Sequence, residues 1–190
     1  MNIHDLLERT GALLRGHFRL SSGLHSLGYV QCARLLEYPQ NANAIGAALA
    51  EELRDLGIRR VVSPALGGVI IGYTVAQALD VPMVFTERKD GEMTLRRGFR
   101  IPASEPVAII EDVVTTGKST AEAAAVVEAA GGSVIAFGAI LDRSGQRNPF
   151  DKPFRALASL DLETWPEDAC PLCLEGVPLD APGSRYSGGR

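Results

Sequence analysis

A short block near the middle of the chain combines acids, hydroxyls and a glycine in a spacing that can hold a phosphorylated sugar. Residues 107–120 are Val-Ala-Ile-Ile-Glu-Asp-Val-Val-Thr-Thr-Gly-Lys-Ser-Thr. The apolar run Val107–Ile110 predicts a strand buried on both faces, and Ser119–Ala130 predicts an alanine-rich helix. Thr115–Lys118 would then form the connecting loop. Its backbone N–H groups and the neighbouring hydroxyls can surround a phosphate without a metal.

The two acids that follow the predicted strand suit a different part of the same ligand. Glu111 and Asp112 would repel a phosphate at contact distance, but one sugar length away they can accept hydrogen bonds from ribose hydroxyls. An ordinary strand-to-helix turn capped by Thr or Ser is the competing interpretation. Two adjacent acids at the end of an apolar strand are hard to explain by capping alone. We therefore expect a phosphosugar site.

Two common nucleotide-binding motifs fit this sequence poorly. Gly117-Lys118-Ser119 resembles the end of a Walker-type loop, but that loop requires a glycine where Asp112 stands. The segment 67–72 resembles a dinucleotide fingerprint, yet Val69 replaces its middle glycine, and a valine side chain would block the approach of a pyrophosphate. A nucleoside triphosphatase is excluded on this basis, and a dinucleotide-binding protein is weakly supported.

The block at 107–120 resembles the phosphoribosyl pyrophosphate (PRPP) motif of the type I phosphoribosyltransferases. Other segments narrow the resemblance to the orotate phosphoribosyltransferases, over about residues 10–145. These segments are Gly16–Gly23 with Ser26 and Tyr29, Ser63–Gly68, Glu87–Lys89 and Leu141–Arg143. The resemblance implies transfer of a phosphoribosyl group from PRPP to orotate in de novo pyrimidine (UMP) biosynthesis. A purine-base phosphoribosyltransferase and a non-catalytic PRPP-sensing regulator remain as alternatives.

The resemblance also assigns roles to residues of the PRPP site. Glu111 and Asp112 are expected to be catalytic and to bind PRPP, with Asp112 near Mg²⁺ directly or through water. A non-proline cis peptide is implied at Leu66–Gly67, where the family often has a lysine in place of Gly67. The other expected PRPP contacts are Arg88, Lys89, Leu66, Gly67, Val113, Val114, Thr115, Thr116, Gly117, Lys118 and Ser119.

A polar segment, Glu87–Ile101, is expected to project from the fold as a mobile hairpin flap, because Asp90-Gly91 is a strong two-residue hairpin signal. The resemblance implies a homodimer in which the flap reaches the neighbouring active site. Arg96 and Arg97 would then stabilise the leaving pyrophosphate, although arginine cannot readily give up a proton. A solvated hairpin of alternating charge is the competing interpretation. The five cations of the flap are Arg88, Lys89, Arg96, Arg97 and Arg100.

Binding of the base is expected to depend on Arg143, which matches the family's orotate-binding arginine. A surface ion pair with Asp142 is the competing interpretation of this residue. Ser21 stands where many family members have a lysine. The other residues that the resemblance places around orotate are Thr115, Tyr29, Val30 and Ser21.

Helix and strand signals alternate along the chain as in an α/β fold with a parallel sheet flanked by helices. Helices are predicted at 41–56 and 68–79, and strands at 61–62, 82–86 and 133–141 in addition to the block at 107–130. The resemblance implies the type I phosphoribosyltransferase fold. We expect one domain over 1–181, with a core at about 36–145, a small hood from about 1–35 and 145–181, the flap at about 87–101, and a loose tail at 182–190.

The carboxyl ends of parallel strands lie at one edge of a sheet, where open α/β sheets bind their ligands. Leu66-Gly67, Asp112 and Arg143 each follow one of the predicted strands. These three segments should therefore meet in a single crevice.

Composition restricts the class of protein further. The chain has 190 residues, 46% of them hydrophobic, and a net charge of −4 with a pI near 5.4. These values favour a compact enzyme over a general nucleic-acid binder, which needs a basic surface. Without an apolar run long enough to span a bilayer or the apolar centre of a signal peptide, a cytoplasmic protein is expected. Three cysteines fit a reducing compartment better than a disulfide framework.

The segment Cys170-Pro171-Leu172-Cys173 supplies half of a tetrahedral zinc site. The other half is missing from the neighbouring sequence, since Cys32, His4, His17 and His25 lie far upstream without paired ligand spacing. A complete site would require proximity in the fold or a symmetry partner. No zinc is therefore expected, and a structural turn is the favoured interpretation.

Overall fold

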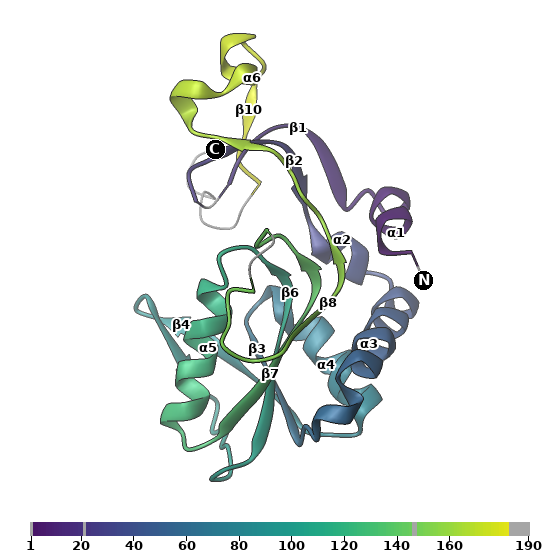
Figure 1. Cartoon of the computed structure of the whole chain (residues 1–190), viewed down its shortest axis with the longest axis vertical. Helices are drawn as coiled ribbons and strands as arrows, with labels where there is room; N and C mark the ends of the chain where they lie inside the picture. Colours follow the sequence, from purple (N-terminus) through teal and green to yellow (C-terminus); the bar gives the residue numbers. More distant parts are fainter. Residues whose placement is uncertain (1, 21, 146–147, 183–190) are drawn as a thin grey trace. The chain divides into compact units, whose positions relative to one another are not determined.

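The computed structural model describes residues 2–20, 22–145 and 148–182, and it divides into two compact units (Figure 1). The core unit is Leu35–Leu160, and the small unit is formed by Met1–Arg34 with Asp161–Arg190. The predicted core ended near residue 145. It extends to Leu160 because β8 (Phe154–Ser159) pairs in parallel with β7 (Ser133–Asp142) and so completes the sheet of the core unit.

The core unit is built on a six-stranded sheet with the order β5-β4-β3-β6-β7-β8. Neighbouring strands are parallel except for the β4–β5 hairpin. Because β4 lies on one side of β3 and β6 lies on the other, the strand order reverses between β3 and β6. Such a reversal is where open α/β sheets bind ligands. The strands not yet given are β3 (Arg60–Pro64), β4 (Met83–Lys89), β5 (Glu92–Leu95) and β6 (Pro106–Val114).

Three helices cover this sheet, with α3 (Pro39–Leu53) and α4 (Gly67–Leu79) on one face and α5 (Lys118–Ala129) on the other (Figure 1). Ile45, Leu49 and Leu53 recur at helical spacing on α3 and are fully buried. The helix predicted to run to residue 56 ends three residues earlier, and a 3-10 turn (Arg54–Leu56) continues the chain. The predicted α/β class with a parallel sheet is confirmed.

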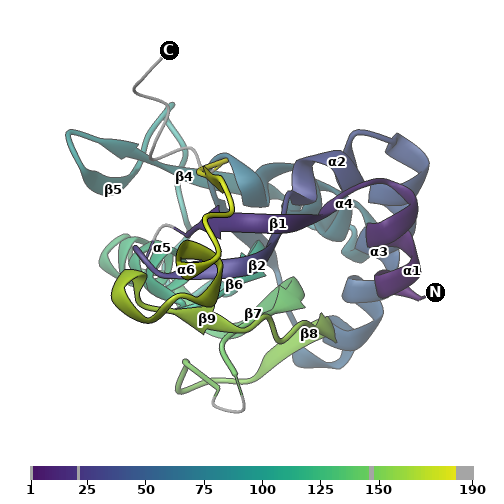
Figure 2. The ribbon, with the colours of Figure 1, turned by 90° about the horizontal axis from the view of Figure 1, so that it is seen from above.

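The β4–β5 hairpin projects from the edge of the core unit (Figure 2). Lys89 pairs with Glu92, so Asp90 and Gly91 alone make the turn, with φ values of 52° and 87°. Both central residues in the left-handed region are typical of the turn that matches the twist of two antiparallel strands. The hairpin predicted from Asp90-Gly91 is confirmed.

The small unit contains a four-stranded sheet with the order β10-β1-β2-β9. The antiparallel pair β1–β2 comes from the N-terminal segment, and each edge strand comes from the C-terminal segment. Within the described part of the whole chain, no helix has the length and apolar character needed to cross a membrane. The remaining elements are α1 (Ile3–Arg9), β1 (Leu13–Arg19), β2 (His25–Val30), α2 (Cys32–Leu36), β9 (Thr164–Trp165), η2 (Glu167–Ala169), α6 (Pro171–Leu174) and β10 (Leu179–Asp180).

Candidate functional site

The acids of the 107–120 block lie on β6 itself. Val107–Ile110 are fully buried, as predicted for a strand covered on both faces. The predicted strand ended at Ile110, but pairing with β7 continues until Val114 lies opposite Asp142. Glu111 and Asp112 are therefore held by sheet backbone, which is more rigid than the loop that follows it.

Burial determines the charge state of Glu111 and Asp112, called the acid pair from here on. Burial, and then the neighbouring Asp112 carboxylate, raises the pKa of Glu111 well above its usual value. Burial also raises the pKa of Asp112, although hydrogen bonds from the Glu111 side chain and from the backbone oppose this rise. One such bond joins the Val113 amide to Asp112 Oδ1 at 2.9 Å. The acid pair thus resists carrying two negative charges unless hydroxyl donors or a cation approach it.

The loop after β6 presents free amides at the N-terminus of a helix. Gly117 occupies the N-cap position of α5 with φ 72°, and a Cβ added there would lie 3.0 Å from the ring of Phe150. In the described chain, the amides of Thr116 and Gly117 donate no hydrogen bond to another backbone group. The α5 helix begins at Lys118, one residue before the predicted start. Unpaired amides at the start of a helix favour an anion.

The loop after β3 lies directly against the acid pair. A Cβ added at Gly67 would lie 2.8 Å from both carboxylate oxygens of Asp112. A Cβ added at Gly68 would lie 2.9 Å from the carbonyl oxygen of Ile110 and 3.0 Å from Glu111 Oε1. Neither position accepts a side chain on this backbone. The lysine that the family often carries at position 67 would therefore collide with Asp112.

The non-proline cis peptide is Ala65–Leu66, one bond earlier than the predicted Leu66–Gly67. Gly67 already belongs to α4, and Leu66 is the N-cap residue of this helix. The Leu66 side chain is 87% exposed at the mouth of this loop.

Arg143 follows β7 beside the end of β6, where its amide donates to the Val114 carbonyl oxygen at 2.7 Å. Asp142 Oδ1 accepts hydrogen bonds from the Ser144 amide at 2.8 Å and the Ser144 hydroxyl at 2.6 Å. The ends of β3, β6 and β7 thus lie at one edge of the sheet, as the sequence predicted for Gly67, Asp112 and Arg143.

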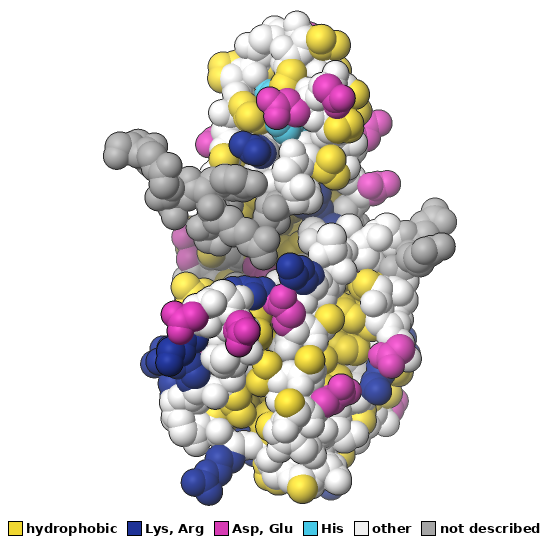
Figure 3. All heavy atoms as spheres, turned by 90° about the vertical axis from the view of Figure 1, so that its left-hand side faces the viewer, with side chains coloured by type: hydrophobic (Ala, Val, Ile, Leu, Met, Phe, Trp, Pro, Cys, Tyr) yellow, Lys and Arg dark blue, Asp and Glu magenta, His cyan; other side chains and the backbone are white. Residues whose placement is uncertain are grey.

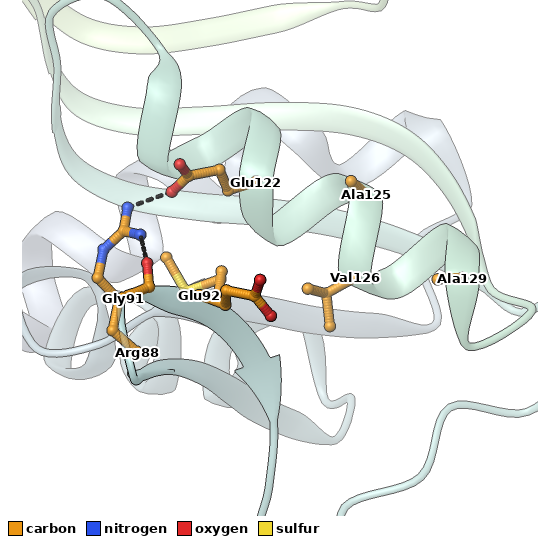
Figure 4. Close-up of a pocket in the computed structure, with 8 residues that line it drawn as sticks. Arg88, Gly91, Glu92, Glu122, Ala125, Val126 and Ala129 are labelled. Atoms are coloured by element: carbon orange, nitrogen blue, oxygen red, sulfur yellow. Dashed lines mark hydrogen bonds and ion pairs between the residues drawn. The ribbon is translucent and has the colours of Figure 1, made fainter.

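Three arginines of the flap, Arg88, Arg96 and Arg97, are paired with carboxylates of their own chain. Arg88 forms an ion pair with Glu122 of α5 and donates to the Gly91 carbonyl oxygen at 2.9 Å (Figure 4). Arg96 and Arg97 lie 3.5 and 3.0 Å from the Glu87 carboxylate. None of these ion pairs involves the acid pair. No residue near Arg88 in the sequence indicates the Arg88–Glu122 contact, since α5 is distant from the flap along the chain.

A groove separates the hairpin from α5, with Arg88 and Glu122 at one end (Figure 4). Met93, Ala125 and Val126 give it an apolar floor. Residues of the 107–117 segment do not line it. The groove is therefore distinct from the crevice at the strand ends.

The predicted orotate-binding residues are divided between the units. Thr115 and Arg143 belong to the core unit, and Tyr29 and Val30 lie on β2 of the small unit. The Tyr29 ring packs against Phe18 with 6.0 Å between centroids. Ser21 lies outside the described residues.

Four residues of the small unit that the sequence did not connect lie together in the structure. His17, His25, Cys170 and Cys173 place one potential ligand atom each within 4.8 Å of one another. This group is called the His–Cys cluster below. The missing half of a zinc site is thus supplied by proximity in the fold, which corrects the interpretation of Cys170–Cys173 as an isolated pair.

Charged side chains on the face seen in Figure 3 are interspersed, with acidic groups beside basic ones. This view presents no continuous basic surface of the kind that a nucleic-acid binder needs. An anionic ligand must be met by local donors such as the amides of Thr116 and Gly117.

Comparison with known proteins identifies the class. The family model described as "Phosphoribosyl transferase domain" matches residues 32–175. The chain therefore belongs to the phosphoribosyltransferase family.

Curated relatives narrow this class. An orotate phosphoribosyltransferase of Thermotoga maritima is 48% identical over 183 residues, which cover 96% of this chain and 98% of the relative. An orotate phosphoribosyltransferase of Chlorobaculum parvum is 46% identical over 181 residues, covering 95% and 93%. Within its family, the chain falls among the orotate phosphoribosyltransferases.

Solved structures share the fold. Orotate phosphoribosyltransferase from Aeropyrum pernix has a TM-score of 0.67 at 24% identity, covering 84% of this chain and 94% of that one. UMP synthase from Leishmania donovani has a TM-score of 0.71 at 24% identity, covering 82% and 35%. Both support the type I phosphoribosyltransferase fold predicted from the sequence.

Proposed function

We propose that this chain transfers the phosphoribosyl group of PRPP to orotate, giving orotidine monophosphate and pyrophosphate, in cytoplasmic de novo pyrimidine biosynthesis. The observation that carries the proposal is the meeting of the acid pair, Gly67 and the free amides of Thr116 and Gly117 at the β3–β6 reversal. Relatives that are 46–48% identical over nearly the whole chain carry the corresponding name.

In this proposal the loop after β6 binds the phosphate on the ribose. The amides of Thr116 and Gly117 and the nearby hydroxyls donate to the phosphate oxygens, and the N-terminus of α5 favours their negative charge. Glu111 and Asp112 accept hydrogen bonds from the ribose hydroxyls. These donors compensate the buried carboxylates, whose pKa values are raised in the free protein. The remaining PRPP contacts are assigned to Val113, Val114, Thr115, Lys118 and Ser119.

The pyrophosphate of PRPP is assigned to the loop after β3. Gly67 and Gly68 carry no side chains of their own at the start of α4, so that their amides can approach phosphate oxygens closely. Leu66 contributes backbone rather than side chain to this contact.

The reaction joins a ring nitrogen of orotate to the anomeric carbon while the bond from that carbon to pyrophosphate breaks. The leaving pyrophosphate keeps the electron pair, so positive charge develops on the ribose. Carboxylates held by β6 next to the ribose stabilise that charge, and fixed donors stabilise the pyrophosphate. The exchange of these two bonds requires no covalent intermediate with the protein.

Mg²⁺ fits the chemistry of the acid pair. Two adjacent carboxylates that are buried and repel each other form an oxygen-donor set suited to a hard divalent cation. Asp112 would hold the ion, directly or through water. When bound, Mg²⁺ supplies positive charge for the pyrophosphate oxygens.

Orotate binding is assigned to Arg143, which offers a fixed cation for the carboxylate of the base, together with Thr115, Tyr29, Val30 and Ser21. Arg143→Ala should raise the KM for orotate at least tenfold while PRPP binding changes less than twofold. Arg143→Lys should recover part of the affinity, because it keeps the charge but not the paired donors. Equal losses for both substrates would refute this assignment.

The flap is assigned to the pyrophosphate of a neighbouring active site in a homodimer. Arg88, Arg96 and Arg97 are paired with Glu122 or Glu87 in this chain, so these arginines must exchange partners to meet a phosphate, and Lys89 is the fourth cation assigned to it. Mixing Arg96→Ala protein with Asp112→Asn protein should restore up to about a quarter of the activity through hybrid dimers. Activity can be restored only if the flap of one subunit acts at the active site of the other. If no activity is restored, the flap serves its own subunit.

The proposed reaction is tested by mixing the protein with PRPP, Mg²⁺ and one base, and then measuring pyrophosphate release. Release is expected with orotate and at least a hundredfold slower with adenine or hypoxanthine. Faster release with a purine would identify a purine-base enzyme. PRPP binding by calorimetry without release for any base would identify a PRPP-sensing regulator.

A further inference from the structure

The His–Cys cluster draws ligands from both chain segments of the small unit. His17 on β1 and His25 on β2 come from the N-terminal segment, and Cys170 and Cys173 come from the turn that leads through α6. His17, His25 and Cys170 are no more than 3% exposed. Cys173 reaches solvent. Three of the four side chains are therefore shielded from water. The cluster shares no residue with the acid pair or with the loop after β6.

Three separations between these atoms are close to the edges of a zinc-centred tetrahedron. Cys173 Sγ lies 3.3 Å from His25 Nδ1 and 3.7 Å from His17 Nε2, and Cys170 Sγ lies 3.5 Å from His17 Nε2. Zinc bonds of about 2.0–2.1 Å to nitrogen and about 2.3 Å to sulfur place neighbouring ligand atoms about 3.3–3.8 Å apart. The contact of 2.9 Å between His17 Nε2 and His25 Nδ1 is shorter, and a small outward shift of one ring would correct it.

His17 is held in the tautomer that a metal requires. Its Nδ1 lies 2.8 Å from the carbonyl oxygen of Val177, which can only accept a hydrogen bond. The proton therefore sits on Nδ1, and the lone pair on Nε2 faces the other three ligand atoms. Metal-binding histidines commonly have their second ring nitrogen fixed in this way.

The C-terminal segment has few other means of attachment. Within the described residues 161–182, Cys170 is the only buried residue. The strands β9 and β10 have two residues each, and α6 has four. Apolar burial of one small side chain cannot hold such a segment in one conformation. A bond network from this segment to β1 and β2 would do so.

We propose that His17, His25, Cys170 and Cys173 form a structural zinc site that fastens the C-terminal segment to the β1–β2 hairpin. Two thiolates and two imidazoles are a tetrahedral ligand set typical of Zn²⁺, and four protein ligands leave no position for a substrate. The two thiols release their protons to solvent when the ion binds. The site is independent of the proposed reaction in the core unit.

The test uses the full chain purified under reducing conditions. We expect close to one zinc per chain by elemental analysis. After removal of zinc, titration with Co²⁺ should give the visible absorption of a tetrahedral cobalt–thiolate complex, saturating at one ion per chain. Both readouts are independent of catalytic activity and require no variant.

Variants then assign the ligands. Cys173→Ser should weaken metal binding at least tenfold, whereas Cys173→His should retain one ion with an altered cobalt spectrum. Cys32→Ala and His4→Gln are matched controls outside the cluster, and both should bind one ion as the native chain does.

Four results would overturn the proposal, and the first three concern metal binding. They are a reduced native chain that takes up neither zinc nor tetrahedral cobalt, a Cys173→Ser variant with native affinity, and loss of the metal in Cys32→Ala. A Cys170–Cys173 disulfide that persists in reductant would also overturn it, because both thiolates would then be unavailable.

Discussion

The acid pair and the His–Cys cluster are both largely buried groups of polar side chains, but they are assembled in opposite ways. Glu111 and Asp112 are neighbours on one strand, supported by the fully buried run Val107–Ile110. The His–Cys cluster joins positions as far apart along the chain as His17 and Cys173. The first group can be recognised in a short stretch of sequence, and the second exists only after the chain has folded.

The two groups also differ in what they require. The acid pair carries raised pKa values because burial disfavours its charges more than the hydrogen bonds it accepts favour them. It suits a substrate that binds and is then released. The His–Cys cluster has four potential ligand atoms within 4.8 Å of one another and a fixed tautomer at His17. The His–Cys cluster suits a permanently bound ion. The acid pair is therefore suited to turnover, and the His–Cys cluster is suited to stabilising the fold.

The largest expected effect comes from removing one charge of the acid pair. Asp112→Asn should lower kcat at least about a hundredfold, because stabilisation of the developing charge is lost. The melting temperature of the ligand-free protein should stay constant or rise, because a buried charge has been removed. Asp55→Asn, a change at an exposed acid, is the control. Native kcat, or a clear drop in melting temperature, would show that Asp112 is structural.

A smaller loss is expected from Gly67→Ala. Its Cβ would lie 2.8 Å from both Asp112 carboxylate oxygens, so the loop or the carboxylate must move. We expect kcat/KM for PRPP to fall about tenfold to a hundredfold. In the Asp112→Asn background the same change should cost less, because the two residues are in contact. Full additivity in this double-mutant cycle would contradict the contact.

Removing metal should affect the small unit and spare the core unit. A chelator, or Cys173→Ser, should expose residues 161–182 to limited proteolysis, detected by mass spectrometry of the fragments. PRPP affinity measured by calorimetry should change less than about threefold, since the acid pair and the loop after β6 belong to the core unit. Equal loss of both properties would show that the two sites depend on each other.

The smallest effect concerns pH. Raised pKa values mean that the native acid pair holds protons that the unfolded chain has already released. The stability of the ligand-free protein should therefore fall as pH rises from the ordinary carboxyl pKa of about 4 through the raised values. We expect a difference of a few degrees in melting temperature between native protein and Asp112→Asn over this window. A native curve that rises more steeply than the variant's would mean that the pair is stabilising when charged.

Much of the core unit was predictable, because its signals are local. The apolar run before Glu111, the Asp90-Gly91 turn and the helical spacing of Ile45, Leu49 and Leu53 each specify an element within a few residues. The predicted boundaries of the elements were less accurate. The end of β6 depends on its pairing with β7, and the cis bond depends on where α4 begins.

The partners of the flap arginines and the addition of β8 to the sheet were not predictable. Glu122 lies on α5, and nothing in the sequence near Arg88 indicates that contact. The pairing of β8 with β7 required the sheet to be present first.

The α/β class, the phosphosugar block and the hairpin could be predicted from residue types alone, because adjacent residues on one strand or turn share an environment that their types reveal. Which distant side chains meet depends on how the whole chain folds. His17 and His25 reach Cys170 and Cys173 only because both edge strands of the small sheet come from the C-terminal segment. Such contacts depend on the path of the whole chain, and no short stretch of residues encodes that path.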